Sequence, residues 1–445
     1  MDDKSSDPAA IKKRRKKVDD NSKVVDNSAT VQGLPLHILY EILVRISSVR
    51  SVVSSKIVHP TWLDLINDSQ FIKAYNEKLK SSICPLLVVR GYKNDIYHQT
   101  MYLLESNNSF DQFTSKIKFH MPNMRLSPRP CVIPRSPYQV QDFVVSSCEG
   151  LVAWTLSYNY YPIIVCNPIT GEYIMVDDAQ IAPNCKLSPR CVFIGIGFNH
   201  QNNHFELLRL IRSIALDNGR ISIRWFTDVC TLGVEPLNWV NTGVAFRSFI
   251  GDFFLGEITQ VININSVIYW MHEGKRSICY FDFEKRVFKV VRIIHMSGDS
   301  GTLSTVGGLG EDRGLFCVSL ISYHDDRVEI WSMKNNGNKG DVIWTRCYHI
   351  VTNFSKLEAI SIFPKVRYSF IKYLENGKVL LQYLNDLFVV YDPSLGVETC
   401  RFRVIEDASV SLYGKKLVLH KPSLIPLREA LKCNNIQVFK GSTDI

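Results

Sequence analysis

Residues with chemically useful side chains are scattered through this chain of 445 residues, and few of them share a spacing that catalysis needs. His200 and His204 are four residues apart, the spacing at which two imidazoles on one helix can hold a metal ion. They lie in FNHQNNHF, whose asparagines favour a turn between two strands. We therefore expect a turn here, and a metal site is the alternative.

The twelve cysteines also bear on metal chemistry, but they run from Cys84 to Cys433 without a single C-x-x-C pair. Cys166, Cys279 and Cys317 each lie within an apolar run. In a reducing compartment such thiols are usually buried in strands. We expect buried thiols, with a structural zinc site as the alternative.

Motifs of nucleotide and hydrolytic enzymes are not found. GGLGEDRG, residues 307–314, is rich in glycine, but no Lys or Ser/Thr follows at the spacing of a phosphate loop. The strand-like LFCVSL comes next, whereas a phosphate cradle normally leads into a helix. We interpret the glycines as a loop connecting two structural units, and we expect a non-catalytic protein without a cofactor.

Tryptophans offer one other kind of site, because they can stack on bases or sugars. In strands they are more often part of the core. We expect the core role, and carbohydrate binding is the rival, for Trp225, Trp239, Trp270, Trp331 and Trp344.

The first thirty residues are polar, and we expect residues 1–30 to be a disordered basic tail. They contain KKRRKK, six adjacent cations that stay extended and accessible. Such a run predicts a nuclear localisation signal; a loose nucleic-acid arm or a solubilising tail are the alternatives. The run consists of Lys12, Lys13, Arg14, Arg15, Lys16 and Lys17.

Residues 31–80 are predicted to form a small helical module. Leu36, Leu39, Leu43 and Ile46 recur at helical spacing, and further apolar residues widen the stripe. Ser48 suits the cap of a second helix, and Thr61 with Asp64 resembles a capping box for a third. So small a bundle cannot cover all its apolar side chains. The surplus predicts either a partner or packing against the chain's own β domain.

From about residue 84 the pattern changes to strands and turns, and one unit recurs six times. Each unit is an apolar strand, Asn or Asp, a turn and a second apolar strand. The units begin at residues 102, 163, 221, 278, 328 and 387, which are 50 to 61 residues apart. This period predicts a mainly β fold with a kelch-like β-propeller of about six blades over residues 84–427, followed by a C-terminal tail, 428–445. A pair of packed β-sandwiches is the alternative.

The helical module resembles an F-box, a resemblance carried by LP-x-x-I-x-x-x-IL-x-R and by Val58 with Trp62 four residues later. The β region resembles the F-box-associated domain of plant proteins. Its matching segments are SCEGLVAW (147–154), CNPITGEY (166–173), GIGFNHQNNHFELLRL (195–210), SVIYWM (266–271), VEIWSM (328–333) and KPSLIPL (421–427). The chain departs from the family at Ser47-Ser48, usually Leu-Pro, and at Pro60, usually a basic residue; these changes are expected to loosen the turn between helices or to weaken partner binding.

The resemblance implies an adaptor of an SCF-type cullin-RING ubiquitin ligase, in which the F-box docks on a Skp-type linker protein and the propeller recruits a protein substrate. The residues expected to contact the linker are Leu34, Pro35, Ile38, Leu39, Ile42, Leu43, Ile46, Val49, Val52, Val58, Trp62 and Ile66. A carbohydrate-binding or glycosidase-like propeller without a ligase role is the alternative.

Overall composition fits this interpretation. The chain is 46% hydrophobic and 21% charged, typical of globular proteins, with a formal net charge of +9. No apolar run is long enough for a transmembrane helix, and the polar N-terminus lacks the core of a secretory signal. We expect the nucleus, the cytoplasm or both, with neither a membrane nor nucleic acid as partner.

Overall fold

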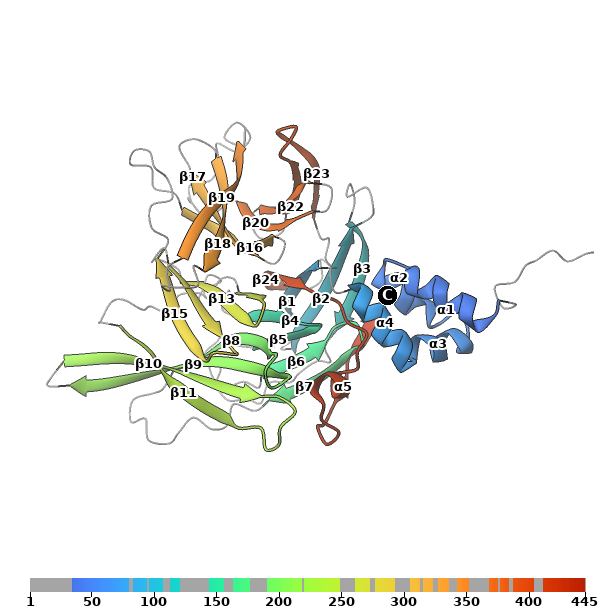
Figure 1. Cartoon of the computed structure of the whole chain (residues 1–445), viewed down its shortest axis with the longest axis horizontal. Coiled ribbons are helices and arrows are strands. Elements are labelled where there is room, and N and C mark those ends of the chain that lie inside the picture. Colours follow the sequence, from blue (N-terminus) through green and yellow to red (C-terminus); the bar gives the residue numbers. More distant parts are fainter. Residues whose placement is uncertain are drawn as a thin grey trace, which may run out of the picture.

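The structure is a computed structural model of the whole chain, shown in Figure 1. It describes residues 34–444 apart from 80–82, 94–95, 107–112, 121–143, 156–162, 177–189, 218–219, 249–260, 273–276, 293–304, 313–314, 323–326, 336–341, 352–367, 375–376, 384–386 and 404–410. The basic run Lys12–Lys17 lies outside the described residues.

Four helices form the N-terminal module, which projects from the side of a much larger β domain (Figure 1). They are α1 (Leu36–Arg45), α2 (Val49–Ser55), α3 (Pro60–Asn67) and α4 (Ser69–Leu79). The predicted cap of α2 is confirmed, since the Ser48 side chain accepts a hydrogen bond from Ser51 N. The predicted capping box of α3 is wrong. The helix begins at Pro60, and Nδ1 of His59 accepts from Thr61 N instead.

The β domain is a six-bladed propeller in which each blade has four antiparallel strands. We number the blades along the chain. Blade 1 is β24 (Ser411–His420), β1 (Cys84–Lys93), β2 (Ile96–Ser106) and β3 (Phe113–His120); blade 2 is β4 (Val145–Cys148), β5 (Leu151–Thr155), β6 (Ile163–Asn167) and β7 (Glu172–Val176); blade 3 is β8 (Arg190–Asn199), β9 (His204–Asp217), β10 (Arg220–Thr231) and β11 (Trp239–Ser248). Blade 4 is β12 (Val261–Ile264), β13 (Val267–His272), β14 (Ser277–Asp282) and β15 (Val287–Arg292); blade 5 is β16 (Thr305–Asp312), β17 (Leu315–Ser322), β18 (Arg327–Asn335) and β19 (Val342–Val351); blade 6 is β20 (Tyr368–Tyr373), β21 (Val379–Tyr383), β22 (Leu387–Asp392) and β23 (Val397–Arg403).

The predicted repeat is confirmed strand by strand. The six unit starts at 102, 163, 221, 278, 328 and 387 fall in β2, β6, β10, β14, β18 and β22, the third strand of each blade. The Asn or Asp that follows makes the hairpin turn in three of them. In each turn a side-chain oxygen of Asn167, Asp282 or Asp392 accepts the backbone N–H groups two and three residues later. The sandwich alternative is thereby replaced by a ring.

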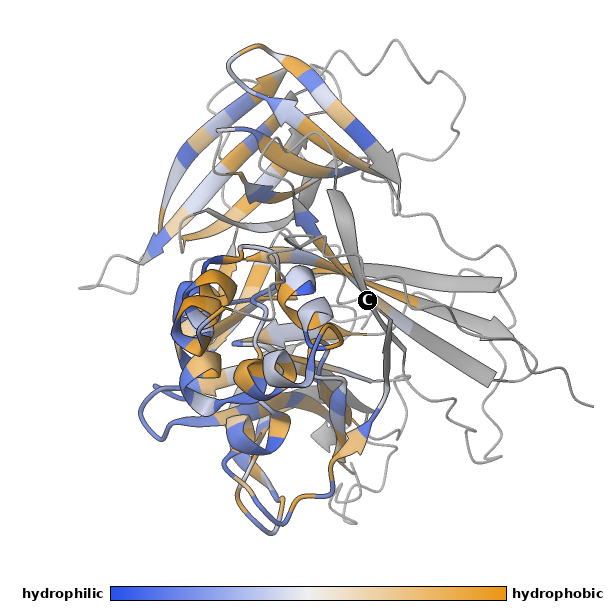
Figure 2. Ribbon diagram, turned by 90° about the vertical axis from the view of Figure 1, so that its right-hand side faces the viewer, coloured by the Kyte–Doolittle hydropathy of each residue, from blue (hydrophilic) through white to orange (hydrophobic). Residues whose placement is uncertain are grey.

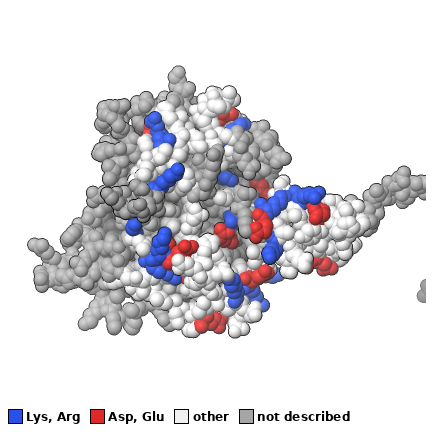
Figure 3. Space-filling model, in the orientation of Figure 1, with Lys and Arg blue, Asp and Glu red and all other residues white. Residues whose placement is uncertain are grey.

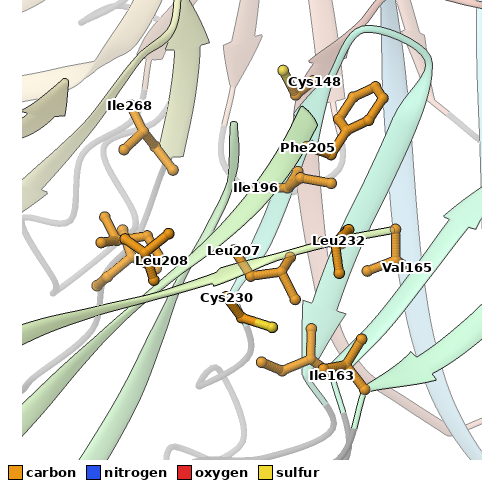
Figure 4. Close-up of a cluster of buried hydrophobic side chains, with 14 of the residues drawn as sticks. Cys148, Ile163, Val165, Ile196, Phe205, Leu207, Leu208, Cys230, Leu232 and Ile268 are labelled. Atoms are coloured by element: carbon orange, nitrogen blue, oxygen red, sulfur yellow. The ribbon is translucent and has the colours of Figure 1, made fainter. Parts of the chain in front are cut away.

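The ring is closed by strands from opposite ends of the domain. The last blade strand, β24, pairs along its length with β1 and supplies the first position of blade 1. Buried apolar clusters then join each blade to the next, around to blade 1 again. The largest lies between blades 2, 3 and 4, which contribute Cys148, Ile196 and Ile268 to it, respectively (Figure 4). A closed ring leaves every blade face covered by a neighbour.

One expectation about the propeller is wrong. Most of the glycine-rich stretch 307–314 is not a connecting loop but belongs to β16, the first strand of blade 5. A Cβ on Gly310 would collide with the ring of Phe370 in blade 6. The glycine is present because two neighbouring blades approach closely there.

The segment 428–445, expected to be a tail, packs on the propeller together with Leu427. It contains α5 (Leu427–Leu431), β25 (Phe439–Lys440) and β26 (Ser442–Asp444). Leu427 and Leu431 are buried in the core of blades 2 to 4. β25 pairs with the outer strand of blade 2 and β26 with the outer strand of blade 1. This segment therefore ties together the two blades that carry the helices.

Candidate docking surface on the helical module

Helix α1 has two apolar rows that meet different surroundings. Leu39 and Leu43 are 4% and 0% exposed and belong to the bundle core. Ile38 and Ile42, also four residues apart, and Leu34, which lies just before the helix, are 39–46% exposed. Residues at this spacing lie above one another on one side of a helix. One row therefore holds the bundle together, and the other faces solvent.

Further apolar side chains are exposed close by in the sequence. Leu36 is the first residue of α1, Ile57 and Val58 lie between α2 and α3, and Leu63 lies on α3. We define the outer face as Leu34, Leu36, Ile38, Ile42, Ile57, Val58 and Leu63. These are seven of the fifteen large hydrophobic residues found exposed in the described parts of the chain, gathered in thirty residues. Such a concentration is typical of a protein-binding surface.

The views of the module agree with this concentration. Figure 2 looks at the helices from the side away from the propeller, and several hydrophobic (orange) segments are visible along them. In Figure 3 the visible face of the module is mostly uncharged, and charged side chains gather where it meets the propeller. Glu41 and Arg45 on α1 form an ion pair at 2.9 Å, but it is exposed and adds little stability.

The residues predicted to contact a linker protein are divided by burial. Leu34, Pro35, Ile38, Ile42 and Val58 are exposed, and Ile46 and Trp62 are half-buried. The other five are buried: Leu39, Leu43, Val49, Val52 and Ile66. A charge placed at Leu43 would disrupt the bundle core rather than probe an interface. Leu36, Ile57 and Leu63 were missed, although Leu36 was part of the predicted apolar stripe.

The opposite side of the module is anchored to blade 1 through a carboxylate. Glu105 on β2, only 8% exposed, accepts hydrogen bonds from the Ser48 hydroxyl at 2.6 Å and from Val49 N at 2.7 Å. Hydrogen bonds to a charged group are stronger than those between neutral groups. Ser48, at a position where the family usually has proline, therefore both caps α2 and attaches it to the propeller.

A second anchor involves the segment 421–427 that follows β24. Leu424 N donates to Oδ1 of Asn76 on α4, at 3.0 Å. Nδ2 of Asn167 donates to the carbonyls of Ser423 and Ile425, and Leu427 N donates to Oε2 of Glu172. Gly150 also lies against this segment, because a Cβ there would collide with Ser423. Three of the segments that resemble the F-box-associated domain therefore meet at one place: SCEG, CNPITGEY and KPSLIPL.

The same joint contains a buried apolar core shared by helices and blades. Tyr40 packs edge-on against Phe71, which stacks on Tyr75 with ring centroids 5.8 Å apart. These helices bury residues in one cluster with Trp154 of blade 2 and Met101 of blade 1. Of the two explanations for the surplus apolar surface, packing on the chain's own β domain accounts for one side of the module. It leaves the outer face uncovered.

Titratable groups near the joint are held in their neutral forms. His420 at the end of β24 is buried, with Nδ1 2.8 Å from Oγ of Ser147, and burial lowers its pKa to about 3. Burial, reinforced by Glu105, raises the pKa of Tyr75. The thiols of Cys148 and Cys166, and that of Cys279 in blade 4, also have raised pKa values because they are buried. A thiol of raised pKa is a poor nucleophile.

The histidines and tryptophans considered as candidate site residues lie in turns and strands of the propeller. His200 lies in the turn between β8 and β9, and His204 begins β9, as predicted. Within the described residues, no three His, Cys, Asp or Glu side chains gather as metal ligands. Trp225 and Trp270 are buried, and Trp239, Trp331 and Trp344 are half-buried in strands. No helix among those described is long and apolar enough to cross a membrane.

Comparisons with known proteins bear on the module and the propeller together. No family model matches the chain. It is 23% identical over 284 residues to F-box protein At3g07870 of Arabidopsis thaliana, which is 57% of this chain and 64% of that protein. It is 22% identical over 188 residues to "Putative F-box protein At3g16210" of the same plant, 42% and 43% of the two chains. The matches span less than two thirds of either relative.

Among solved structures, apo AztD from Citrobacter koseri is 9% identical and covers 82% of this chain and 100% of its own, with a TM-score of 0.30. A TM-score this low carries no argument. The two named relatives support the resemblance of this chain to plant F-box proteins.

Proposed function

We propose that this chain is a substrate-recognition adaptor of an SCF-type cullin-RING ubiquitin ligase. Its outer face docks on a Skp-type linker protein, and its propeller recruits a protein substrate for ubiquitination. The observation that carries the proposal is the outer face itself, seven exposed apolar side chains on a module whose other side is fused to the propeller. The similarity to two proteins named F-box supports it.

Burial of the outer face supplies the driving force for docking. Fully burying one exposed large apolar side chain contributes about 1.5–3 kcal/mol, and each outer-face residue, 39–87% exposed, contributes part of that against the entropy cost of association. The adaptor performs no chemistry. Its contribution is to hold a substrate at a fixed place relative to the ligase, and the anchors at Glu105 and Asn76 keep helices and propeller in one orientation.

A matched pair of substitutions tests the docking. Ile42 on α1 and Ile343 on β19 are 46% and 49% exposed. A charged side chain at either position can therefore stay in contact with water and avoid the cost of desolvation. Ile42→Asp should abolish co-purification of a Skp-type linker, and Ile343→Asp should leave it unchanged. Equal retention of the linker by both variants would contradict the proposal. Carbohydrate binding by a chain that retains no linker would favour the glycosidase-like alternative.

Entry into the nucleus is a separate proposal that rests on the basic run alone. We propose that residues 12–17 act as the localisation signal. Changing Lys13, Arg14, Arg15 and Lys16 to Ala should shift a fluorescent fusion toward the cytoplasm. An unchanged nuclear fraction would contradict this role.

A further inference from the structure

The connection between α1 and α2 has features of a modification site. Ile46 and Ser48 are in extended backbone conformations, and Ser47 between them is exposed. Arg45 lies three residues before Ser48, and its side chain is 78% exposed. Protein kinases that prefer basic substrates bind an arginine at this distance from the serine in an acidic groove.

The hydroxyl of Ser48 also has a role that a phosphate could not fill. It donates a 2.6 Å hydrogen bond to Oε2 of Glu105, and Val49 N donates to the other oxygen of the same carboxylate. A phosphoserine has no hydroxyl proton at Oγ and carries about −1.5 to −2 charges at neutral pH. It would meet the Glu105 carboxylate at hydrogen-bond distance, where like charges repel strongly because Glu105 is buried, whereas Ser48 itself is only half-buried.

We propose that Ser48 is a phosphorylation site, and that its modification releases α2 from blade 1 and so regulates the adaptor, a role that rests on the proposed function. In the reaction, Oγ attacks the γ-phosphorus of ATP supplied by a basophilic kinase. The new Oγ–P bond replaces the bond from that phosphorus to the β,γ-bridging oxygen, ADP leaves, and the hydroxyl proton passes to the base of the kinase.

The expected consequence is selective. The outer-face residues lie on other parts of the module, and Ile42, for example, makes no contribution to the buried core. The phosphorylated chain therefore keeps its docking surface but loses the fixed orientation between that surface and the propeller. It would bind the ligase while presenting its substrate poorly.

The first experiment treats the full chain with a basophilic Ser/Thr kinase and ATP and maps the phosphate by mass spectrometry. Phosphate at Ser48, absent in Ser48→Ala and incorporated more slowly in Arg45→Ala, is the expected result. Modification elsewhere only, or a rate independent of Arg45, would overturn the proposal.

The second experiment measures the anchor without a kinase, by hydrogen exchange of the Val49 amide in the full chain. Ser48→Asp should accelerate this exchange by about tenfold or more. Ser48→Asn is the matched control, because Asn has nearly the shape of Asp but is uncharged and can still donate to Glu105. It should change the exchange rate of the Val49 amide little. Adding Glu105→Gln to Ser48→Asp should restore the protection of the Val49 amide, because the glutamine side chain at position 105 can donate a hydrogen bond to the carboxylate introduced at position 48.

Equal exchange in the Asp and Asn variants, or no restoration in the double variant, would overturn the proposed release. Neither readout involves the linker protein. A failure here is therefore distinguishable from a failure of docking, which the Ile42→Asp and Ile343→Asp pair measures.

Discussion

The two sides of the helical module are built from the same residue types, but one side packs in a buried core and the other faces solvent. On the propeller side, Leu39 and Leu43 join a core that continues into blades 1 and 2. On the solvent side, Ile38 and Ile42 are about two-fifths exposed or more. An apolar stripe on a helix thus shows that something covers it, but only the packing shows which row is covered by the chain itself.

Removing the module should have the largest effect. A fragment of residues 84–445 would expose the part of the shared core that the helices cover, including residues around Trp154 and Met101. We expect a loss of several kcal/mol of stability and a tendency to aggregate. Thermal unfolding and light scattering of the fragment and the whole chain measure this. A fragment that unfolds as cooperatively and at the same temperature would show that the joint is not a shared core.

Single substitutions in α1 sharpen the comparison of its two rows. Leu43→Ala should lower the free energy of unfolding by about 2–5 kcal/mol, because it leaves a cavity in the core. Ile42→Ala should change it by about 0.5 kcal/mol or less, since the side chain is already exposed. Chemical denaturation of both variants is the measurement. Similar losses in the two would remove the distinction between the rows.

The anchor at α4 is expected to have a smaller effect. Asn76→Ala leaves the N–H of Leu424 without its acceptor, which should cost about 1–3 kcal/mol. Denaturation curves of the variant and of the unmodified chain measure this loss, and an unchanged free energy of unfolding would mean that the hydrogen bond to Leu424 does not hold α4 in place.

The pH dependence of the free energy of unfolding tests the burial of His420, at the end of the ring-closing strand β24. The pKa of His420 is lowered to about 3 in the fold, against about 6.5 in an unfolded chain. The neutral ring is therefore favoured by folding. Its contribution is complete above pH 6.5 and is lost as the pH falls toward 3, by about 1.4 kcal/mol for each pH unit. His420→Gln should flatten this slope between pH 6 and 4; an unchanged slope would contradict the assignment.

Much of the fold could be predicted because its signals are local. The strand–turn–strand unit repeats with Asn167, Asp282 and Asp392 at the same position, and it predicts six blades. Closure of the ring could not be predicted from local signals, because it depends on pairing between β1 and β24, which lie at opposite ends of the domain in the sequence. The glycines around Gly310 were misread since their reason, the ring of Phe370, lies in another blade.

The exposed outer face was predicted only in part for the same reason. Periodicity places Leu43 and Ile42 on one broad stripe, and nothing in the local sequence separates them. The separation depends on α4 and on blades 1 and 2, which are distant along the chain. The anchor at Glu105 was not anticipated, although the unusual Ser47-Ser48 pair was the signal that could have indicated it.

The central claim is that the outer face, and not the propeller, binds the linker protein. Hydrogen exchange of the whole chain, with and without a Skp-type linker, tests it most directly. We expect protection in residues 34–46 and 57–63, around the exposed apolar side chains, and none in β19, which carries the equally exposed Ile343. Protection confined to the blades, or no protection at saturating linker, would contradict the account.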